Sequence, residues 1–432
     1  MADYLKRGDE VSAEASLDVR RLVAEMLEDV EARGEEAVRE YSEKLDGWNP
    51  ESFRLSEEQI EGAAATIDDD LRRHLELAAS QIRGFAEAQL ETMRPLDVEI
   101  GDGVTLGHRH IPVGSVGTYV PGGRYKLVSS ALMSVLTAKV AGVGRVVTMS
   151  APSGGEWGIH APTIYAMRLG GADGIHALGG VQAMAAMAFG ALEDLAPVDM
   201  LVGAGNVYVA EAKRQLFGRV GIDLIAGPTE ILVIADESAR PRVVAVDLLG
   251  QAEHGPTSPA VLVTTSHKLG ELVLDEISSL LKTWPTADVT AQAWHDFGTV
   301  VVAENVAEAI ALSDAFAPEH LELQVEDSGP YEEGLRNYGS LFVGENTTVP
   351  FGDKCVGTNH TLPTSGAARY TGGLWVGKYL KTLTYQKLTG EASRRMAVAA
   401  GAISRAENMP GHAISAEIRL EMEEHHRARD PK

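Results

Sequence analysis

The 432-residue chain is poor in cysteine, in long apolar runs and in positive charge. Its single cysteine, Cys355, can form neither an internal disulfide nor a cysteine-rich metal site. No apolar run approaches the roughly 18 residues that cross a bilayer, and the first residues lack the apolar core of a secretory signal. Lys and Arg number 38 against 62 Asp and Glu, a formal net charge of −24. We therefore expect a cytoplasmic protein that binds neither nucleic acid nor a membrane.

The composition is otherwise that of a folded globular protein, with 44% hydrophobic and 23% charged residues. At roughly 150 residues per domain, the length predicts two or three domains. Apolar residues recur at helical spacing over residues 19–30 and again over 71–90, each time with a charged opposite face. These two segments predict amphipathic helices that cover another part of the protein.

From about residue 113, short β-branched runs alternate with helical stretches of 10 to 15 residues, a pattern typical of a parallel sheet with helices on both faces. We expect two successive sets of strands, and hence two doubly wound α/β halves. The expected strands are 116–120, 145–149, 174–178 and 200–202 in the first set, and 231–235, 260–265 and 300–303 in the second. After about residue 374 we expect helices at 375–383, 391–399 and 413–426.

Glycine-rich turns at 114–123, 179–180 and 203–206 could bind a nucleotide, because such turns let phosphate approach the backbone. None has the complete G-x-G-x-x-G spacing, since Tyr208 occupies the place of the third glycine after Gly203 and Gly205. Glycines that only permit tight turns between strand and helix are an equally good interpretation.

Several polar pairs offer chemistry. Gln251 and His254 share one face of an apolar helix, and Glu319 and His320 follow Pro318. Each pair also has a structural interpretation, as a helix end or as a solvated acid. A long loop, residues 349–363, and a turn, residues 407–412, add further acids and imidazoles. The set that would suit zinc through nitrogen and oxygen alone is Gln251, His254, Asp353 and His412.

These stretches together resemble the histidinol dehydrogenase family over nearly the whole chain. The matching segments are VGTYVPGG at 116–123, ALMSVLTAKVAGV at 131–143, GGVQA at 179–183, GNVYVAEAKRQLFG at 205–218, AGPTEILVIAD at 226–236, GQAEHG at 250–255, APEHLE at 317–322 and GTNHTLPT at 357–364. The resemblance implies two incomplete Rossmann-like domains with helical extensions, an intertwined homodimer, and oxidation of a primary alcohol to a carboxylate with NAD and zinc. The implied domains are 1–112, 113–229, 230–373 and 374–432.

The resemblance also implies roles for single residues. Gln251, His254, Asp353 and His412 would bind zinc, the last from the partner subunit. Glu319 and His320 would be the catalytic pair, with His320 as base and Glu319 activating water. The positions that would contact substrate are Thr229, His360 and Glu407. Those that would line the NAD site are Tyr119, Gln182 and Asn206.

Two features depart from the usual histidinol enzymes. Thr229 stands where serine is typical, which keeps the hydroxyl. The segment 366–386 resembles instead the branch that oxidises 2,3-dihydroxypropane-1-sulfonate to sulfolactate, and it shares YGSLFVGENTTVPFGDK at 338–354 with that branch. A sulfonate needs positive charge and donors. Cations expected to flank the site are Arg124, Lys126, Arg369, Lys378 and Lys381, although for any one of them a solvated helix face is the better interpretation.

The resemblance thus implies dihydroxypropanesulfonate as the substrate, oxidised in two hydride transfers. L-Histidinol is the alternative that keeps the same chemistry, because His360 and Glu407 are retained. A catalytically silent ligand-binding homologue is a more distant alternative. It would be expected to lack at least one metal or catalytic residue, and all six are present.

Overall fold

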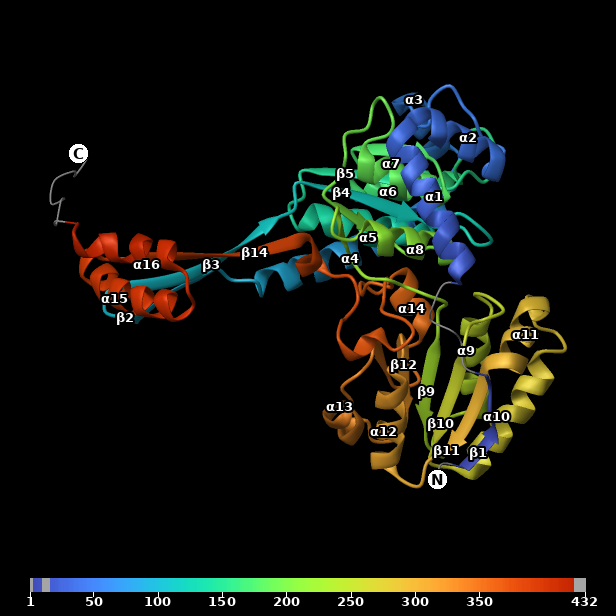
Figure 1. The fold of residues 1–432 in the computed structure, drawn as a ribbon. Coiled ribbons are helices and arrows are strands. Elements are labelled where there is room, and N and C mark those ends of the chain that lie inside the picture. The colour runs from blue at the N-terminus through green and yellow to red at the C-terminus, as the bar shows by residue number, and fades with distance from the viewer. Residues whose placement is uncertain (1–2, 10–15, 423–432) are drawn as a thin grey trace. The chain divides into compact units, whose positions relative to one another are not determined.

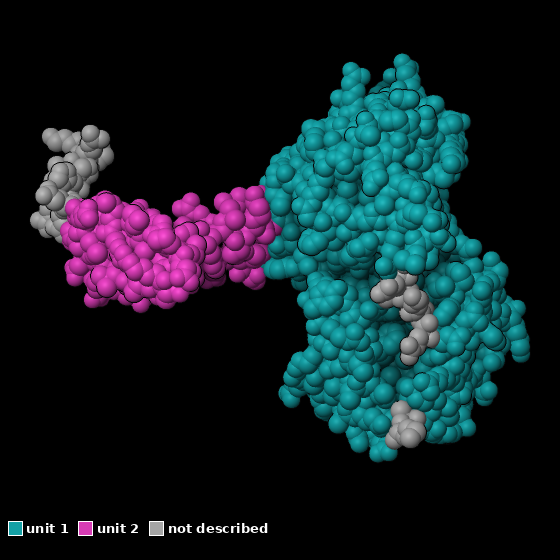
Figure 2. Space-filling view, viewed as in Figure 1, with its two compact units in different colours: residues 1–90, 113–379 teal, residues 91–112, 380–432 magenta. Residues whose placement is uncertain are grey.

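The computed structural model describes residues 3–9 and 16–422. The chain forms two compact units, coloured separately in Figure 2. The first comprises residues 1–90 and 113–379, and the second comprises residues 91–112 and 380–432. No helix among the described residues is long and apolar enough to cross a membrane.

The first sheet of the first unit is entirely parallel, with strand order β6-β5-β4-β7-β8. Its strands are β4 (Ser115–Val120), β5 (Arg145–Ser150), β6 (Gly174–Ala177), β7 (Met200–Val202) and β8 (Gly221–Ile222). The helices between them are α5 (Val128–Val140), α6 (Ala161–Gly170), α7 (Gly180–Phe189) and α8 (Val207–Leu216). All four strands expected from the first set of β-branched runs are confirmed. The apolar α5 is buried along most of its length, because the sheet and α6 cover it.

The second sheet has the order β1-β11-β10-β9-β12-β13, parallel except for the edge strand β1 (Asp3–Lys6). Its other strands are β9 (Ile231–Ala235), β10 (Ala260–Thr264), β11 (Gly298–Val302), β12 (His320–Gln324) and β13 (Ser340–Val343). The associated helices are α9 (Pro241–Ala252), α10 (His267–Leu280), α11 (Ala287–Phe297), α12 (Val306–Phe316), α13 (Gly329–Gly334) and α14 (Val349–Lys354). Both sheets stand out in Figure 1, and the expected α/β class is confirmed.

Amphipathic helices precede the first sheet: α1 (Leu17–Arg33), α2 (Glu35–Asp46), α3 (Glu57–Ala65) and α4 (Asp69–Glu91). The two expected from periodicity lie within α1 and α4. The apolar face of α1 packs on α7 and α8, where Val23, Met26 and Val30 are buried. Helix α3 packs on α6. These helices therefore close the apolar surface of the first sheet.

The second unit is built on an antiparallel sheet of order β14-β3-β2. Its strands are β2 (Leu96–Gly101), β3 (Val104–Pro112) and β14 (Leu380–Leu388), followed by helices α15 (Gly390–Ala406) and α16 (Pro410–Glu417). The helix expected at 375–383 is wrong: a short 3-10 turn, Val376–Tyr379, leads directly into β14. All nine residues of β14 pair with β3, and this long-range pairing overrides local helical spacing.

Other expectations about the ends of the chain are only partly met. The helix expected at 391–399 lies within α15, but the one expected at 413–426 ends as α16 at Glu417, with a 3-10 turn at Ile418–Leu420. Residues 423–426 of that prediction lie outside the described residues. The lead-in to residue 112, expected to be helical, contains β2 and β3. The domain boundaries at 113, 230 and 374 stay predictions.

Candidate active site

The first sheet changes direction of winding between β4 and β7, because β5 lies on one side of β4 and β7 on the other. Ligands of doubly wound sheets bind at such a point, at the carboxyl ends of the strands. Tyr119 is near the carboxyl end of β4, and Asn206 follows β7 as the N-cap of α8, accepting hydrogen bonds from the Tyr208 and Val209 amides. Two of the three residues expected to line the NAD site therefore lie at this edge.

The third, Gln182, lies in the first turn of α7 beside Tyr119. The Gly180 amide donates to the Tyr119 hydroxyl at 3.2 Å, and Gln182 Nε2 donates to Asp46 Oδ2 at 3.0 Å. Among the described residues no group hydrogen-bonds to the buried Gln182 Oε1. The N-termini of α7 and α8 present the positive ends of their helix dipoles, an arrangement suited to a pyrophosphate.

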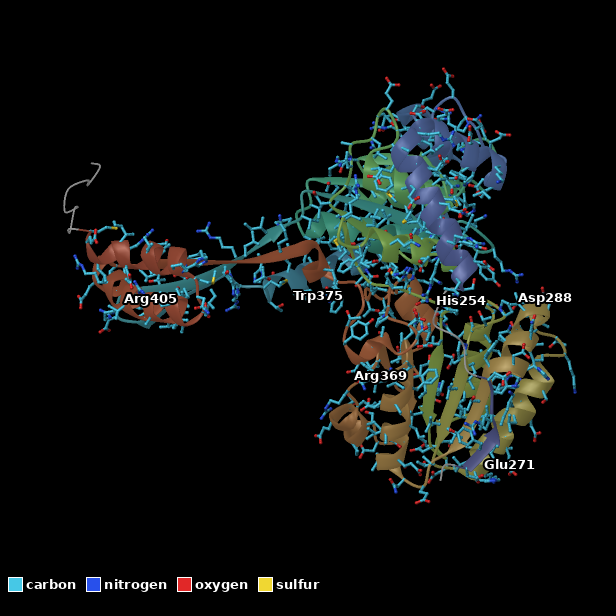
Figure 3. All side chains as sticks on the ribbon, in the orientation of Figure 1. His254, Glu271, Asp288, Arg369, Trp375 and Arg405 are labelled. Carbon is cyan, nitrogen blue, oxygen red and sulfur yellow. The ribbon has the colours of Figure 1, made fainter. Side chains whose placement is uncertain are left out.

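In the second sheet the candidate residues lie at the amino ends of the strands, not at their carboxyl ends. Thr229 immediately precedes Glu230 and β9, while Glu319 precedes β12 and His320 begins it. Helix α9 follows β9 and runs back toward this edge, so it brings Gln251 and, just beyond its end, His254 to the same place. Figure 3 labels His254 at this edge. The side chains predicted from the sequence lie close together because the amino ends of parallel strands share one edge of the sheet.

A chain of short hydrogen bonds joins these residues. Gln251 Nε2 donates to Thr229 Oγ1 at 2.6 Å, and the Thr229 hydroxyl donates to Glu319 Oε2 at 2.5 Å. The Glu230 amide also donates to Glu319 Oε2 at 3.0 Å. Burial raises the pKa of Glu319 to about 7, although the neighbouring His320 and these hydrogen bonds oppose the shift. A carboxyl group with this pKa can exchange a proton near neutral pH.

His320 is held through one ring nitrogen only. Its Nδ1 lies 2.9 Å from the Glu230 carbonyl oxygen, to which an Nδ1–H donates, and 3.5 Å from Glu319 Oε2. Its buried Nε2 has no hydrogen-bond partner among the described residues and lies 3.6 Å from Asp353 Oδ1. Burial alone would lower the pKa of His320, but Glu319 and Asp353 outweigh burial and raise it to about 9. The ring therefore presents Nε2 to whatever binds beside Asp353.

Three of the four expected zinc ligands, Gln251, His254 and Asp353, line one cavity of about 700 Å³ in the first unit. Burial lowers the pKa of His254 to about 4, so the imidazole is neutral and its lone pair can bind a metal. For Asp353, burial opposes ionisation, but the neighbouring His320 and His360 hold its pKa well below the usual range. Amide, imidazole and carboxylate donors in one cavity fit a zinc site that keeps a position open.

Within the described ranges, no three His, Cys, Asp or Glu side chains gather closely enough to hold a metal ion. Of the expected zinc ligands, the first unit contains His254 and Asp353 of these types, and its third expected donor is the amide of Gln251. His412 lies on α16 and Glu407 directly follows α15, so both belong to the second unit. His412, the fourth expected zinc ligand, is thus not part of the first unit.

His360, expected to contact substrate, is engaged on both sides of its ring. Its Nδ1 lies 3.0 Å from the Asp353 carbonyl oxygen and its Nε2 lies 2.7 Å from Ser130 Oγ. An Nδ1–H donates to that carbonyl, and the Ser130 hydroxyl can donate to Nε2. His360 thus fixes the end of α14 at Asp353. Asp353 itself was expected in a loop, but it lies on this short helix.

Two residues of this site were missed from the sequence. Glu230 orients both His320 and Glu319 through its backbone, and burial raises the pKa of its own carboxyl to about 8. Its place between Thr229 and the buried strand β9 was an available signal. Ser130, on α5, touches His360, and only the tertiary structure brings these two residues together.

The expected cations are distributed unevenly. Lys126 lines the cavity and donates through Nζ to the Gly122 and Gly123 carbonyl oxygens, and Lys354, not among the expected cations, lines it as well. Arg369 instead donates to the Ala315 carbonyl oxygen, and Lys378 donates to Thr371. Arg124 is exposed, and Lys381 is on β14 of the second unit. Of the five expected cations, Lys126 is the one that lines the cavity in the first unit.

Comparison with known proteins agrees with this arrangement. The profile described as histidinol dehydrogenase matches residues 10–420. A histidinol dehydrogenase homolog of Shouchella clausii is 51% identical over 97% of this chain and 99% of its own length. The sulfopropanediol 3-dehydrogenase of Ruegeria pomeroyi is 46% identical over 97% and 96% of the two chains.

Among solved structures, the histidinol dehydrogenase of Elizabethkingia anophelis superimposes with a TM-score of 0.89 at 32% identity, covering 96% of this chain and 94% of that one. Its fold is therefore the fold of this chain over nearly the whole length. The chain belongs to the histidinol dehydrogenase family, whose members are NAD-dependent oxidoreductases acting on CH–OH groups.

Proposed function

We propose that this protein uses bound zinc to oxidise a primary alcohol to a carboxylate through an aldehyde. Two NAD molecules are consumed in turn, one in each hydride transfer. The observation that carries the proposal is that Gln251, His254 and Asp353 line one cavity, with the Nε2 of His320 aimed at Asp353. Bound zinc would lower the pKa of a coordinated hydroxyl, and NAD would accept hydride.

Two side chains, His320 and Glu319, each carry out one of the proposed proton transfers. With Asp353 bound to zinc, its carboxylate would raise the pKa of His320 less, so His320, oriented by the Glu230 carbonyl, would accept the hydroxyl proton at Nε2 as a neutral imidazole. Glu319, held by Thr229 and the Glu230 amide, takes a proton from the water that hydrates the aldehyde. Both side chains are buried, which excludes bulk water from these transfers.

We further propose that His412 completes the zinc site from the partner subunit of an intertwined homodimer. The first unit supplies three donors to the cavity, and the fourth expected donor belongs to the second unit. Glu407, five residues before His412, would reach the substrate from the same partner.

For the substrate we propose 2,3-dihydroxypropane-1-sulfonate, with 3-sulfolactate as product. Lys126 and Lys354 line the cavity, and they would attract a sulfonate and repel the protonated amine of histidinol. The name of the 46% identical relative from Ruegeria pomeroyi supports this choice. L-Histidinol is the second candidate, because the superimposed Elizabethkingia anophelis protein is a histidinol dehydrogenase.

The two candidates are separated by following NADH formation with each alcohol in turn. We expect two NADH per dihydroxypropanesulfonate and no turnover of L-histidinol. Lys126→Gln should raise KM for the sulfonate about 10-fold, a loss typical of one charge-assisted contact. The matched control is Lys268→Gln at an exposed position on α10, which should leave KM unchanged. Turnover of histidinol alone would contradict the proposed substrate.

The metal is tested independently of the substrate. His254→Ala and Asp353→Ala should each lose bound zinc, because each removes a direct ligand. The exposed Asp275→Asn on α10 is the control and should keep it. Elemental analysis after gel filtration measures the zinc. Full zinc content in both ligand variants would contradict the proposed site.

A further inference from the structure

Strand β12 carries three buried polar side chains on one face. His320, Glu322 and Gln324 stand at alternate positions, which in a strand point to the same side, and none is more than 3% exposed. Leu321 and Leu323 point the other way, into a separate apolar cluster. His320 belongs to the active site, whereas Glu322 and Gln324 have no role in the proposed reaction.

Glu322 is bound to the start of α14. Its Oε1 accepts the backbone N–H of Val349, the first residue of that helix, at 3.1 Å, and its Oε2 accepts Gln324 Nε2 at 3.1 Å. Asp353 lies one turn further along α14. The Glu322 carboxyl group thus holds the N-terminus of the short helix that presents Asp353.

Asp247 makes the corresponding connection to α9. Its Oδ2 accepts Gln324 Nε2 at 2.8 Å, and its Oδ1 accepts the hydroxyl of Thr348 at 3.0 Å, directly before α14. Asp247 lies one helical turn before Gln251 on the same helix. Burial and the nearby Asp247 raise the pKa of Glu322 to about 8, so around neutral pH Glu322 is protonated.

Strand β12 therefore lies against helices α9 and α14 in two successive layers of side chains. In one layer His320 of β12 lies 3.3 Å from Gln251 of α9 and 3.6 Å from Asp353 of α14. In the next layer, Glu322 and Gln324 of the same strand join Asp247 and Val349 of the same two helices. Asp247 and Val349 of the second layer each lie one helical turn from a proposed zinc ligand of the first. A shift of α9 or α14 in the second layer would therefore move Gln251 or Asp353.

We propose that Glu322 is a positioning residue, whose buried carboxyl group sets the distance between α9 and α14 and thereby the geometry of the zinc ligands Gln251, His254 and Asp353. This inference rests on the proposed zinc site. The group acts through its hydrogen bonds and not through charge. A glutamine would keep an acceptor for Val349 N–H, and its amide could donate to Asp247. A leucine would remove every one of these contacts.

The experiment compares Glu322→Leu with Glu322→Gln, and the readout is zinc affinity by competition with a chromogenic chelator. Outer-shell partners of metal ligands change affinity about 10- to 100-fold when lost. We expect a loss of this size in Glu322→Leu and less than about 3-fold in Glu322→Gln. Rescue by the isosteric amide is an outcome that general loss of packing would not produce.

Two further variants keep the test decisive. Leu262 of β10 is fully buried in the same apolar cluster as Val349 and makes no hydrogen bond through its side chain, so Leu262→Ala should lower the thermal midpoint without changing zinc affinity. Thr348→Val removes one hydrogen bond of the network, so it should weaken zinc about 3-fold even if Glu322→Leu does not fold.

The outcomes separate the two proposals. A wild-type protein that binds no zinc overturns the proposed function and this inference with it. Wild-type binding with unchanged affinity in both Glu322→Leu and Thr348→Val overturns the positioning role alone. An equal loss of affinity in Leu262→Ala would also overturn it, because zinc would then follow stability in general.

Discussion

At the scale of single residues, the tautomer of His320 decides what the site can do. The Glu230 carbonyl oxygen accepts a hydrogen bond from Nδ1, which leaves Nε2 as the nitrogen that faces Asp353. A backbone carbonyl cannot change its role by titration, so this orientation persists over a wide pH range. The base and the metal ligands are therefore fixed by different groups.

This separation predicts the behaviour of His320→Asn. We expect kcat to fall about 10³-fold, the usual contribution of a positioned base, while zinc content and NAD affinity stay close to wild type. Steady-state NADH formation and elemental analysis measure the two properties. His295→Asn, on the exposed end of α11, is the control. Near-normal turnover of His320→Asn would show that another group accepts the proton.

A second residue-scale prediction concerns stability below neutral pH. His176, in β6, is 1% exposed, and its Nε2 lies 3.6 Å from Asp194. Burial lowers its pKa from 6.5 to about 4, against the opposing attraction of Asp194. Between these values the unfolded chain binds a proton that the folded chain does not, so stability must fall as the pH falls from 6.5 to 4.

The loss through His176 can reach about 3 kcal/mol, since one pKa unit corresponds to about 1.4 kcal/mol. Urea unfolding at pH 7.0, 5.5 and 4.5 would measure it. In His176→Gln, which cannot titrate, the decline with pH should be shallower than in wild type. Identical slopes for the two proteins would contradict the assignment.

At the scale of elements, a buried ion pair fixes the turn between β7 and α8. Lys213 of α8 donates through Nζ to the Gly203 carbonyl oxygen at 2.7 Å and to Asp223, and Asp223 in turn accepts the Gly203 amide at 2.8 Å. Gly203 has φ of 119°, and a side chain there would collide with the Tyr119 carbonyl oxygen. The ion pair thus shapes the turn that leads to Asn206.

Breaking this pair should affect both stability and NAD. Lys213→Met leaves Asp223 buried without its partner, and we expect a loss of about 3–5 kcal/mol in the free energy of unfolding together with a raised KM for NAD. Lys213→Met combined with Asp223→Leu should regain much of the stability, because no buried charge remains. Urea unfolding and NAD titration test this. A double variant no more stable than the single one would contradict the explanation.

The elements also show what the sequence can and cannot predict. Seven strands of the two sheets were predictable because each is a continuous apolar run between turn residues, as in Ile231–Ala235, whereas β1 and β8 offer no such run. The first residues of β14, 380–383, were assigned to a helix because their conformation depends on β3, more than 260 residues earlier in the chain. Likewise α14 was expected as a loop, since the bond that holds its start comes from Glu322 on another element.

The site was predictable only in part, for a related reason. The family resemblance pointed to Gln251, His254, Asp353, Glu319 and His320, and the structure brings these five together at one edge of a sheet. The contributions of Glu230 and Ser130 come through a carbonyl oxygen and a hydroxyl. Neither residue type is distinctive in a sequence, so their roles require the fold.

At the scale of the whole molecule, the proposed catalytic residues Glu319 and His320 lie in the first unit and His412 lies in the second. If His412 acts on the partner's site, two inactive variants can repair each other. In a mixed dimer of His320→Asn and His412→Asn, one of the two sites combines an intact His320 with an intact His412.

Co-expression of these two variants with different tags should therefore restore activity. Each mixed dimer has one working site of two, so the purified mixed dimer should show about half of wild-type activity. NADH formation by the doubly purified mixed dimer measures it, with each variant alone as control. A mixed dimer as inactive as its parents would mean that each site uses the His412 of its own chain.

The second sheet places its chemistry at the amino ends of its strands, which leaves the turns after their carboxyl ends outside the reaction. These turns, at 236–240, 265–266, 303–305 and 325–328, connect elements without contributing any residue of the proposed site. Evolution could lengthen them, and an engineer could insert a peptide there, without disturbing proton transfer or zinc.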